Sequence, residues 1–435
     1  MNVLIVSDKF KCGGLETHIK TIYDKLKKRN KIFFAFGDYE SNIEINRGRI
    51  FDNFNFSNNC TINEFCNDVD NLIKIINNKK IDVIMANPFY SLFPCIFAAH
   101  LTNTKIVYTC HGVVSLNYYM SKNDTFLFHL AFENTIKKVF YVNKLSEATL
   151  HYYPRVRSVF FPNLVDFDIY YKHEISYNKK WALISRLDDD KEEEIKKFFS
   201  IVDCLDINEI DVYGSGNSED YLKDFIINND IKTIIKFKGA QSDLPNILKN
   251  KYTGIIGLGR VSLEGLTMNY PVLLIGYGKI IGVIDKNIYN AVKDFNFVPN
   301  ELCEINIKKL QSQIKDINNG KIKQFCFRDT IIRDFNDEKY ISILHDELND
   351  FEFSGTKKMI NTYQEIINNK TDEKFYSSNN IFYILCKNLK DTILNPMLRS
   401  IILMYNEMEY DRQNYNKKIK QLEAKYEEIE NLLTK

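Results

Sequence analysis

The chain lacks the residue patterns that mark disulfide-rich, zinc-binding or membrane-spanning proteins. Its nine cysteines form no Cys-X-X-Cys pair and show no zinc-ligand spacing. Scattered cysteines of this kind favour a reduced, cytoplasmic setting. The N-terminal apolar run is too short for a signal peptide and is expected to form a strand. The longest candidate membrane segment, 380–403, carries charges at Lys387, Lys390, Asp391 and Arg399, so no transmembrane helix is expected.

The chain also lacks an excess of charge of either sign. Its 58 basic and 57 acidic residues give a formal net charge of +1, so nucleic acid is not expected as a partner. The basic run 25–31 could make a peripheral contact with anionic lipid, or could complement a helix dipole and stay solvated. Walker A, GxSxG, HExxH and GxGxxG fingerprints are all missing, and no arrangement of nucleophile, base and acid can be assembled.

What is present is an ordinary globular composition with alternating strand-like and helix-like runs. A hydrophobic content of 45% over 435 residues predicts two domains and an appendage. The alternation predicts an α/β protein in which two parallel sheets, each wrapped by helices, face a cleft. Strands are expected at 3–6, 32–36, 81–85, 106–108, 139–142, 159–161, 182–185, 210–213, 234–237, 254–256 and 272–275, and the first domain's helices at 15–28, 62–76, 93–101 and 126–136.

The expected domains are an N-terminal unit at 1–165 and a second unit at 166–350. A helical connector at 351–397 and a coiled coil at 398–435 follow. In the last segment, apolar or tyrosine side chains recur at alternating steps of three and four from Leu398 to Leu433, interrupted by Arg412. Such a seam predicts self-association or binding of a partner protein. A single amphipathic helix folded back on the body is the alternative.

The most informative stretch is 254–276, GIIGLGRVSLEGLTMNYPVLLIG. A short strand runs into a loop containing Gly259, and a helix carrying Glu264 follows before a second strand begins. This order is typical of a nucleotide-binding crevice at the edge of a parallel sheet. Glycine lets the backbone approach a phosphate, the helix N-terminus favours negative charge, and a carboxylate can accept hydrogen bonds from ribose hydroxyls.

Other candidate site residues follow expected strands. Gly14 opens the first helix, and His111 follows the strand at 106–108, at a carboxyl edge of the first sheet. Arg186 follows the strand at 182–185, and Lys191 begins the next helix. Two cations there suit a diphosphate, while Asp188, Asp189 and Asp190 between them fit the start of a helix better than a metal site. Gly214 and Gly216 form another turn after a strand. Each glycine can also be purely geometric, and His111 a structural histidine.

Taken in order, these segments resemble the retaining nucleotide-sugar glycosyltransferases of the GT-B fold, glycosyltransferase family four. The motifs are GGLETH, YTCHG, FPNLVDF, SRLDDDK, VYGSG, FKGAQSDL and IGLGRVSLEGLTMNYPVLL, and the resemblance spans about 1–350. It implies two Rossmann-like domains, a donor such as a UDP-sugar, and a glycan, lipid-linked or protein acceptor in surface polysaccharide biosynthesis. It also implies retention of configuration without metal or cofactor, with the leaving phosphate assisting deprotonation of the acceptor.

The resemblance implies residue roles as well. Gly14 would lie against the diphosphate or the acceptor, and His111 would face the transferred sugar. Arg186 and Lys191 would hold the diphosphate, and Glu264 would bind ribose. The turns at Gly214 and Gly216 and the loop at Gly259 would complete the donor site.

One position departs from the family pattern, which usually has two glutamates separated by seven residues. Glu264 matches the second of them. The first, which contacts the transferred sugar in the family, would lie eight positions earlier. That position is Ile256 here. Arg260 could take over that sugar contact, binding phosphate or an acidic sugar, or could be an exposed loop arginine. Three functions therefore stay open: an active glycosyltransferase, a catalytically silent GT-B scaffold subunit, and a nucleotide-sugar epimerase.

Overall fold

The computed structural model describes residues 1–11, 13–40, 47–112, 115, 135–151, 153, 155–241, 243–299, 302–368 and 371–375. One compact unit comprises Met1–Ile360 and Lys370–Ser377 and contains both sheets, and a second comprises Asn361–Asn369 and Ser378–Lys435. The predicted coiled coil at 398–435, much of the predicted connector at 351–397 and most of the predicted helix at 126–136 lie outside the described residues.

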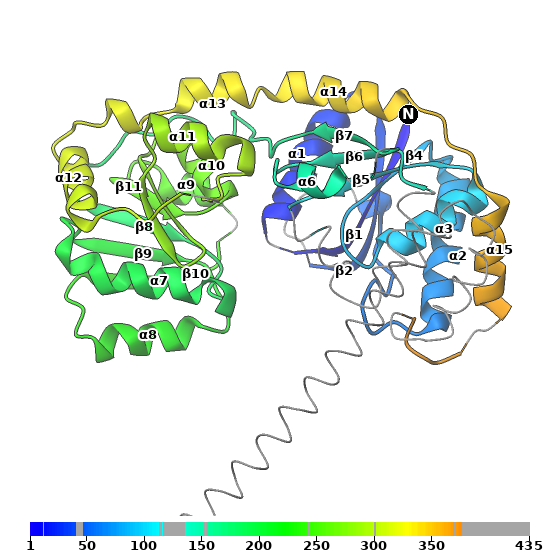
Figure 1. Ribbon diagram of the computed structural model, residues 1–435, viewed down its shortest axis with the longest axis horizontal. Coiled ribbons are helices and arrows are strands. Elements are labelled where there is room, and N and C mark those ends of the chain that lie inside the picture. Colours follow the sequence, from blue (N-terminus) through cyan, green and yellow to red (C-terminus); the bar gives the residue numbers. More distant parts are fainter. Residues whose placement is uncertain are drawn as a thin grey trace, which may run out of the picture. The chain divides into compact units, whose positions relative to one another are not determined.

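The first sheet is parallel and has the order β3-β2-β1-β4-β5-β6-β7 (Figure 1). Its central strands are buried on both faces, as expected of a sheet covered by helices on each side. The elements are β1 (Asn2–Phe10), α1 (Gly14–Leu26), β2 (Lys31–Tyr39), β3 (Ile50–Phe51), α2 (Ile62–Lys79), β4 (Val83–Ala86), α3 (Leu92–Thr102), β5 (Lys105–Cys110), β6 (Lys138–Tyr141), α6 (Ser146–Leu150) and β7 (Arg157–Phe160).

The second sheet has the order β10-β9-β8-β11-β12-β13, and β13 alone among its described strands pairs antiparallel. Strand β13 and the two-residue β3 were not predicted from the sequence. The elements are β8 (Lys180–Ile184), α7 (Asp189–Ile201), β9 (Glu209–Tyr213), α8 (Glu219–Asn228), β10 (Ile234–Gly239), α9 (Leu244–Leu248), β11 (Gly254–Gly257), α10 (Arg260–Thr267), β12 (Val272–Gly276), β13 (Lys279–Val283), α11 (Lys286–Val292), α12 (Ile307–Asn318), α13 (Arg328–Asp334), α14 (Asp337–Asn349) and α15 (Lys357–Asn368).

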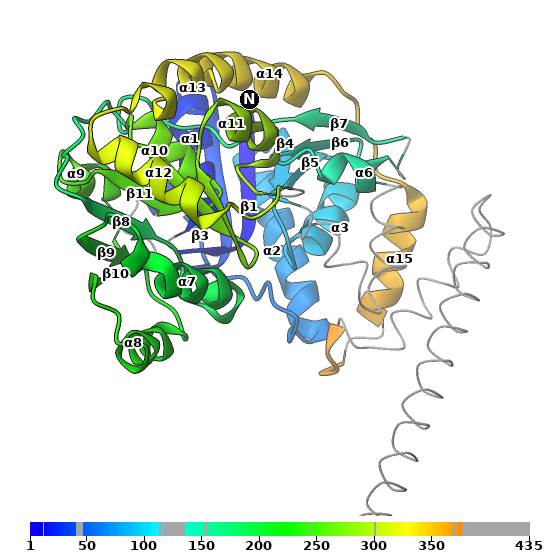
Figure 2. The ribbon, with the colours of Figure 1, turned by 60° about the vertical axis from the view of Figure 1, so that its left-hand side comes forward.

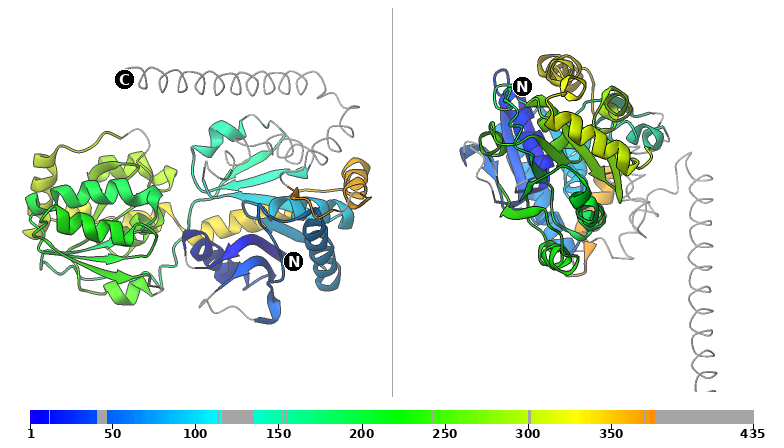
Figure 3. Two further views of the ribbon diagram at one scale, coloured as in Figure 1. Left: turned by 90° about the horizontal axis from the view of Figure 1, so that it is seen from below. Right: turned by 90° about the vertical axis from the view of Figure 1, so that its left-hand side faces the viewer.

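Alternate side chains of β8 divide the second domain into two cores. Ala182 and Ile184 pack in one cluster with residues of α9, α10, α11 and α13. Trp181 and Leu183 pack in the other with residues of α7, α8 and α12. Figure 3 shows α7 and α8 side by side on one face of this sheet. Successive side chains of a strand point to opposite faces of the sheet, so both faces are apolar and each is covered by a layer of helices.

Both sheets reverse their strand order beside their first strand. In the first sheet β2 and β3 lie on one side of β1 and β4 on the other, and in the second sheet β8 is likewise flanked by β9 and β11. At such a point the two connecting loops diverge and leave a crevice at the carboxyl ends of the strands, where ligands of α/β proteins bind. The fold thus marks two edges: that of β1 and β4, and that of β8 and β11.

Helix α14 follows the second sheet along the chain but belongs to the first domain. Figure 2 shows this helix beside the N-terminal start of β1, and its Leu344 and Leu348 pack in the core formed by β1, β2 and α1. Lys138 of β6 donates through Nζ to Oε2 of Glu347 at 2.6 Å and to the Glu347 carbonyl at 2.8 Å. The predicted second domain at 166–350 therefore includes a helix whose apolar face completes the first.

Within the described residues, no helix combines the length and apolarity needed to cross a membrane. Two lysines of the basic run 25–31 are engaged in ion pairs. Lys25 Nζ lies 2.6 Å from Asp337, and Lys27 Nζ contacts Asp24 at 2.5 Å.

Candidate functional site

The edge of the first sheet gathers three polar features. Gly14 begins α1 directly after β1, Asn87 follows β4, and His111 follows β5. His111 Nε2 lies 2.8 Å from Oδ1 of Asn87. Because these strands are adjacent and parallel, residues far apart in the sequence meet here. Asn87 was not among the predicted site residues, although its place directly after a strand was a usable signal.

The hydrogen bonds around Asn87 fix the tautomer of His111. The Asn87 amide donates through Nδ2 to the Val6 carbonyl at 3.0 Å, so its Oδ1 is the acceptor and His111 Nε2 is the donor. Desolvation lowers the pKa of His111 to about 3. His111 is therefore a neutral imidazole whose unprotonated Nδ1 can accept a hydrogen bond from a substrate hydroxyl.

At the edge of the second sheet, Arg186 follows β8 and Lys191 lies in the first turn of α7. The Arg186 side chain is 62% exposed and pairs with Asp188 and, at 3.0 Å, with Asp190. Lys191 Nζ lies 3.5 Å from Asp190 and 5.2 Å from the centre of the Tyr277 ring. Both cations thus stand at the predicted place, and an arriving diphosphate would compete with Asp188 and Asp190 for them.

Gly214 and Gly216 allow two loops of this edge to pack backbone to backbone. Gly214 has a φ of +150°, and a Cβ there would lie 1.8 Å from the Ser185 carbonyl oxygen. A Cβ at Gly216 would lie 2.2 Å from the carbonyl carbon of Leu187. The loop after β9 therefore supports the loop that carries Arg186. The described structure gives these glycines a geometric role, and their predicted contact with the donor stays a prediction.

The predicted loop and helix after β11 are present, with Gly259 as the N-cap of α10. Gly259 has a φ of +62° and offers no side-chain cap, so the first backbone N–H groups of α10 are open to an anion. Glu264 is 8% exposed, and its Oε1 accepts from Nε of Arg260 at 2.7 Å. Desolvation raises the pKa of Glu264.

Arg260 is buried rather than exposed on a loop. It is 8% exposed, and its Nη2 lies 3.5 Å from Oγ1 of Thr21 in α1. A Cβ at Gly14 would lie 4.0 Å from Arg260 Cδ. The structure thus brings together Gly14 and Arg260, which the sequence analysis singled out separately. Thr21 and the neighbouring His18 were missed, although both share a face of α1 with Gly14 at helical spacing.

Ile256 is part of the core. It is fully buried, pairs in register with Leu183 and Leu273, and packs in the cluster that includes α7 and α12. A carboxylate at this position would be surrounded by aliphatic side chains, which would penalise its charge. The departure from the expected glutamate is therefore accommodated by packing in this chain.

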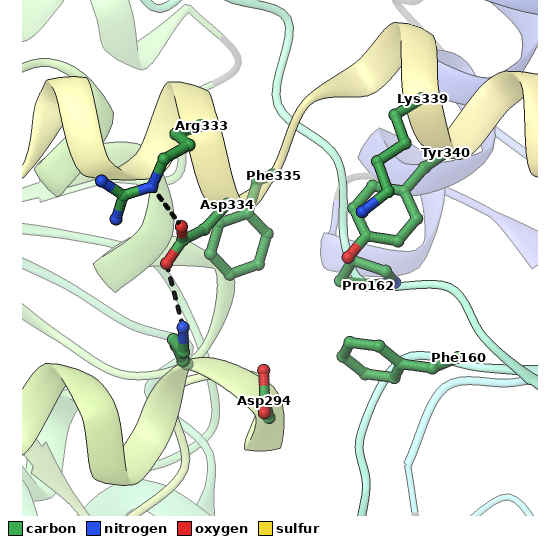
Figure 4. A pocket seen from close by; sticks show the side chains of 9 residues that line it. Phe160, Pro162, Asp294, Arg333, Asp334, Phe335, Lys339 and Tyr340 are labelled. Carbon is green, nitrogen blue, oxygen red and sulfur yellow. Dashed lines mark hydrogen bonds and ion pairs between the residues drawn. The ribbon is translucent and has the colours of Figure 1, made fainter.

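A cavity of about 290 Å³ lies away from these residues. Figure 4 shows Arg333 and Asp334 of α13 on one side and Lys339 and Tyr340 of α14 on the other. The lining is completed by Phe160, Pro162, Lys293, Asp294 and Phe335. None of the predicted site residues lines it, so it does not identify the donor site.

Comparison with known proteins adds a family match and a fold match. Residues 12–168 match the family model described as Glycosyltransferase Family 4. No protein of curated function matches the chain in sequence. The matched range covers the first domain, including Gly14 and His111.

Solved structures match nearly the whole sheet-containing part. Sucrose-phosphate synthase from Thermosynechococcus elongatus aligns with a TM-score of 0.62 at 12% identity, covering 80% of this chain and 98% of that one. Anabaena HepE in complex with UDP-glucose aligns with a TM-score of 0.61 at 15% identity, covering 81% and 100%. S. aureus TarM in complex with Fondaparinux, alpha-GlcNAc-glycerol and UDP aligns with a TM-score of 0.58 at 12% identity, covering 80% and 100%.

These likenesses confirm the predicted GT-B fold of two Rossmann-like domains. The match over 12–168 shows that the first domain is similar to Glycosyltransferase Family 4. The site residues themselves rest on the geometry described above.

Proposed function

We propose that the chain transfers a sugar from a nucleoside diphosphate donor to a glycan, lipid-linked or protein acceptor. The observation that carries this proposal is the edge of β8 and β11, where Arg186, Lys191 and the uncapped N-terminus of α10 supply positive charge around one crevice. A diphosphate with its several anionic oxygens fits such a set of donors.

In the proposed reaction, the bond between the sugar C1 and the phosphate oxygen breaks, and the nucleoside diphosphate leaves with the electron pair. Arg186, Lys191 and the α10 N–H groups would offset the charge that develops on it. The acceptor hydroxyl would attack C1 on the face that the phosphate leaves, passing its proton to a phosphate oxygen, so that configuration is retained. Neutral His111 would accept a hydrogen bond through Nδ1, and Oε2 of Glu264 would bind ribose.

The proposal includes a reaction that needs no metal or other cofactor, because protein cations take the charge-neutralising role. It is supported by the position of Arg186 and Lys191 and by the family match over 12–168. Transfer measured with and without a chelating agent tests this part, and the anomeric configuration of the product by NMR tests retention. Loss of transfer on chelation would contradict metal independence, and a product of inverted configuration would contradict retention.

A nucleotide screen tests the proposed function as a whole. Thermal shifts of the purified chain with UDP, GDP and ADP, followed by transfer or donor hydrolysis with the matching sugars, should show binding and turnover. UDP is the first choice because HepE and TarM, which share the fold, are described in complex with UDP-glucose and UDP. A chain that binds none of the nucleotides and turns over no donor would disprove the proposal.

A catalytically silent scaffold is a second candidate, favoured by two observations. Ile256 is buried in the core, and both cations already have carboxylate neighbours. A silent subunit would show no turnover alone and would raise the activity of a partner glycosyltransferase. Loss of transfer in Arg186→Ala would argue against it.

We further propose that the chain acts in the cytoplasm in the synthesis of a surface polysaccharide and associates through 398–435. The support for association is the apolar seam of that segment. Light scattering of the full chain should give a mass above that of one copy, and the double variant Ile419→Asp/Leu422→Asp should reduce it. An unchanged mass would contradict association through this seam.

A further inference from the structure

The point where α1 and α10 meet holds hydrogen-bond donors that the proposed chemistry leaves unused. Arg260 uses Nε on Glu264 and Nη2 on Thr21, and its Nη1 has no partner within the described residues. The side chain is 8% exposed. An unpaired guanidinium nitrogen at this depth is costly unless a ligand or water supplies an acceptor.

A buried histidine lies beside it. His18 of α1 is fully buried, and the Asn163 side chain is its hydrogen-bond partner, although the geometry of that bond is poor. Its ring meets that of His111 edge to face at 5.1 Å between centres. Desolvation and the nearby Arg260 hold the pKa of His18 well below its usual range. It is therefore a neutral ring whose one N–H has Asn163 as an acceptor, so Arg260 is the donor that is left over.

Acceptors are scarce at the same place. Glu264 is the carboxylate of α10, and its Oε1 is taken by Arg260. Tyr170 stands within hydrogen-bonding reach of the same carboxylate. A sugar hydroxyl must donate as well as accept, whereas a carboxylate only accepts. A site with spare donors and few acceptors matches a carboxylate better than a hydroxyl.

The Glu264 carboxylate also fixes the direction of the guanidinium. The pair is spaced i, i+4 on one helix, which places the two side chains on one face. With Nε held at 2.7 Å, the planar fork of Arg260 is oriented before any ligand arrives. Glu264 is thus a positioning residue for Arg260 in addition to its proposed ribose contact.

We propose, on the basis of the proposed function, that the donor sugar carries a carboxylate and that Arg260 binds it through Nη1. The substrate class is a nucleoside diphosphate hexuronic acid or a similar acidic sugar. The nucleotide lies at Arg186, Lys191 and the N-terminus of α10, and the acidic end of the sugar points to Arg260.

Paired donors with the same nucleotide provide the test, by calorimetric titration. If UDP binds, UDP-glucuronate is compared with UDP-glucose, and if GDP binds, GDP-mannuronate is compared with GDP-mannose. The acidic donor should bind at least about 10-fold more tightly, a value typical of one charge-assisted contact. In Arg260→Gln that ratio should fall to about one, while the affinity for the free nucleoside diphosphate changes less than about threefold. Arg260→Lys should keep part of the preference, because a charge remains.

Two control variants separate a loss of preference for the acidic donor from a general loss of folding. Arg333→Gln removes a guanidinium that is 72% exposed on α13 and should leave the ratio unchanged. Arg260→Gln leaves Glu264 unpaired, so Arg260→Gln/Glu264→Gln serves as a second variant with no net charge change in the interior. Its lost ribose contact affects both donors equally, and its ratio should also be about one.

Three outcomes would overturn this inference. A wild-type ratio of one excludes carboxylate recognition. An equal loss of affinity for UDP, UDP-glucose and UDP-glucuronate in Arg260→Gln assigns Arg260 to the phosphates instead. No binding of any nucleoside diphosphate overturns the proposed function itself, and this inference with it.

Discussion

Arg260 Nε donates to Oε1 of Glu264 at 2.7 Å, and the two side chains are 8% and 10% exposed. The pair links the start of α10 to its second turn at the carboxyl edge of the second sheet. Replacing both partners of such a buried ion pair by apolar residues changes stability little. Removing only one partner is strongly destabilising, because the other charge stays buried without a counter-ion.

Glu264→Gln should lower the free energy of unfolding by about 3 kcal/mol, because the Arg260 charge stays buried without its counter-ion. The double variant Arg260→Met/Glu264→Leu removes both charges and should lose less than about 1.5 kcal/mol. Urea unfolding of the three proteins checks this. A double variant as unstable as the single variant would show that lost packing, rather than the uncompensated charge, causes the loss of stability.

Arg186→Ala should reduce transfer by about 100-fold, the scale for removing one donor that stabilises a leaving group. Its stability should change by less than about 0.5 kcal/mol, because the side chain is 62% exposed. Steady-state transfer rates and urea unfolding separate the two effects. Lys321→Ala, another exposed cation, is the matched control and should leave transfer unchanged. Full activity in Arg186→Ala would remove this residue from the site.

Gly214→Ala should lower the free energy of unfolding by more than about 2 kcal/mol, because the new Cβ would lie 1.8 Å from the Ser185 carbonyl oxygen. Gly320→Ala is the control. Gly320 also has a positive φ, +77°, but no atom lies within 4 Å of its Cβ position, so only a backbone cost of about 1 kcal/mol is expected. Equal losses in the two variants would contradict the steric explanation.

His100 should make the protein less stable in acid. Its Nδ1 accepts from the Thr356 N–H at 3.0 Å, its Nε2 lies 2.9 Å from Thr135 Oγ1, and desolvation lowers its pKa to about 4. Below pH 6.5 the unfolded chain binds a proton that the folded chain refuses, so stability falls as pH drops from 6.5 toward 4. Between pH 7 and pH 5, His100 should lower the free energy of unfolding by about 2 kcal/mol.

The pH dependence is measured by urea unfolding at pH 7, 6 and 5. His100→Gln should be less stable at pH 7 but should lose less stability on acidification than the unmodified chain. His345→Gln, at a partly exposed position of α14, is the control and should keep the steeper dependence. Parallel curves for the unmodified chain and His100→Gln would refute this assignment.

The sequence determined the pattern of the fold. Apolar runs separated by helical periods placed every predicted strand within a few residues of an observed one, because local periodicity reports which faces are buried. β13 was missed because it pairs antiparallel in a short hairpin after β12, outside the strand–helix alternation. The place of Arg186, Gly259 and His111 just after strands was also predictable, since each comes within a few residues of an apolar run, and so was that of Lys191 at the start of the next helix.

Only the tertiary structure decided what those residues contact. Ile256 turned out to be a core residue, because alternation along β11 points it into the cluster with α7. Arg260 turned out to be buried against Glu264 and Thr21, and Thr21 lies more than 200 positions earlier in the chain. Helix α14 completes the first core although it follows the second sheet. Contacts between residues so far apart in the chain depend on how the elements pack, which local periodicity does not encode.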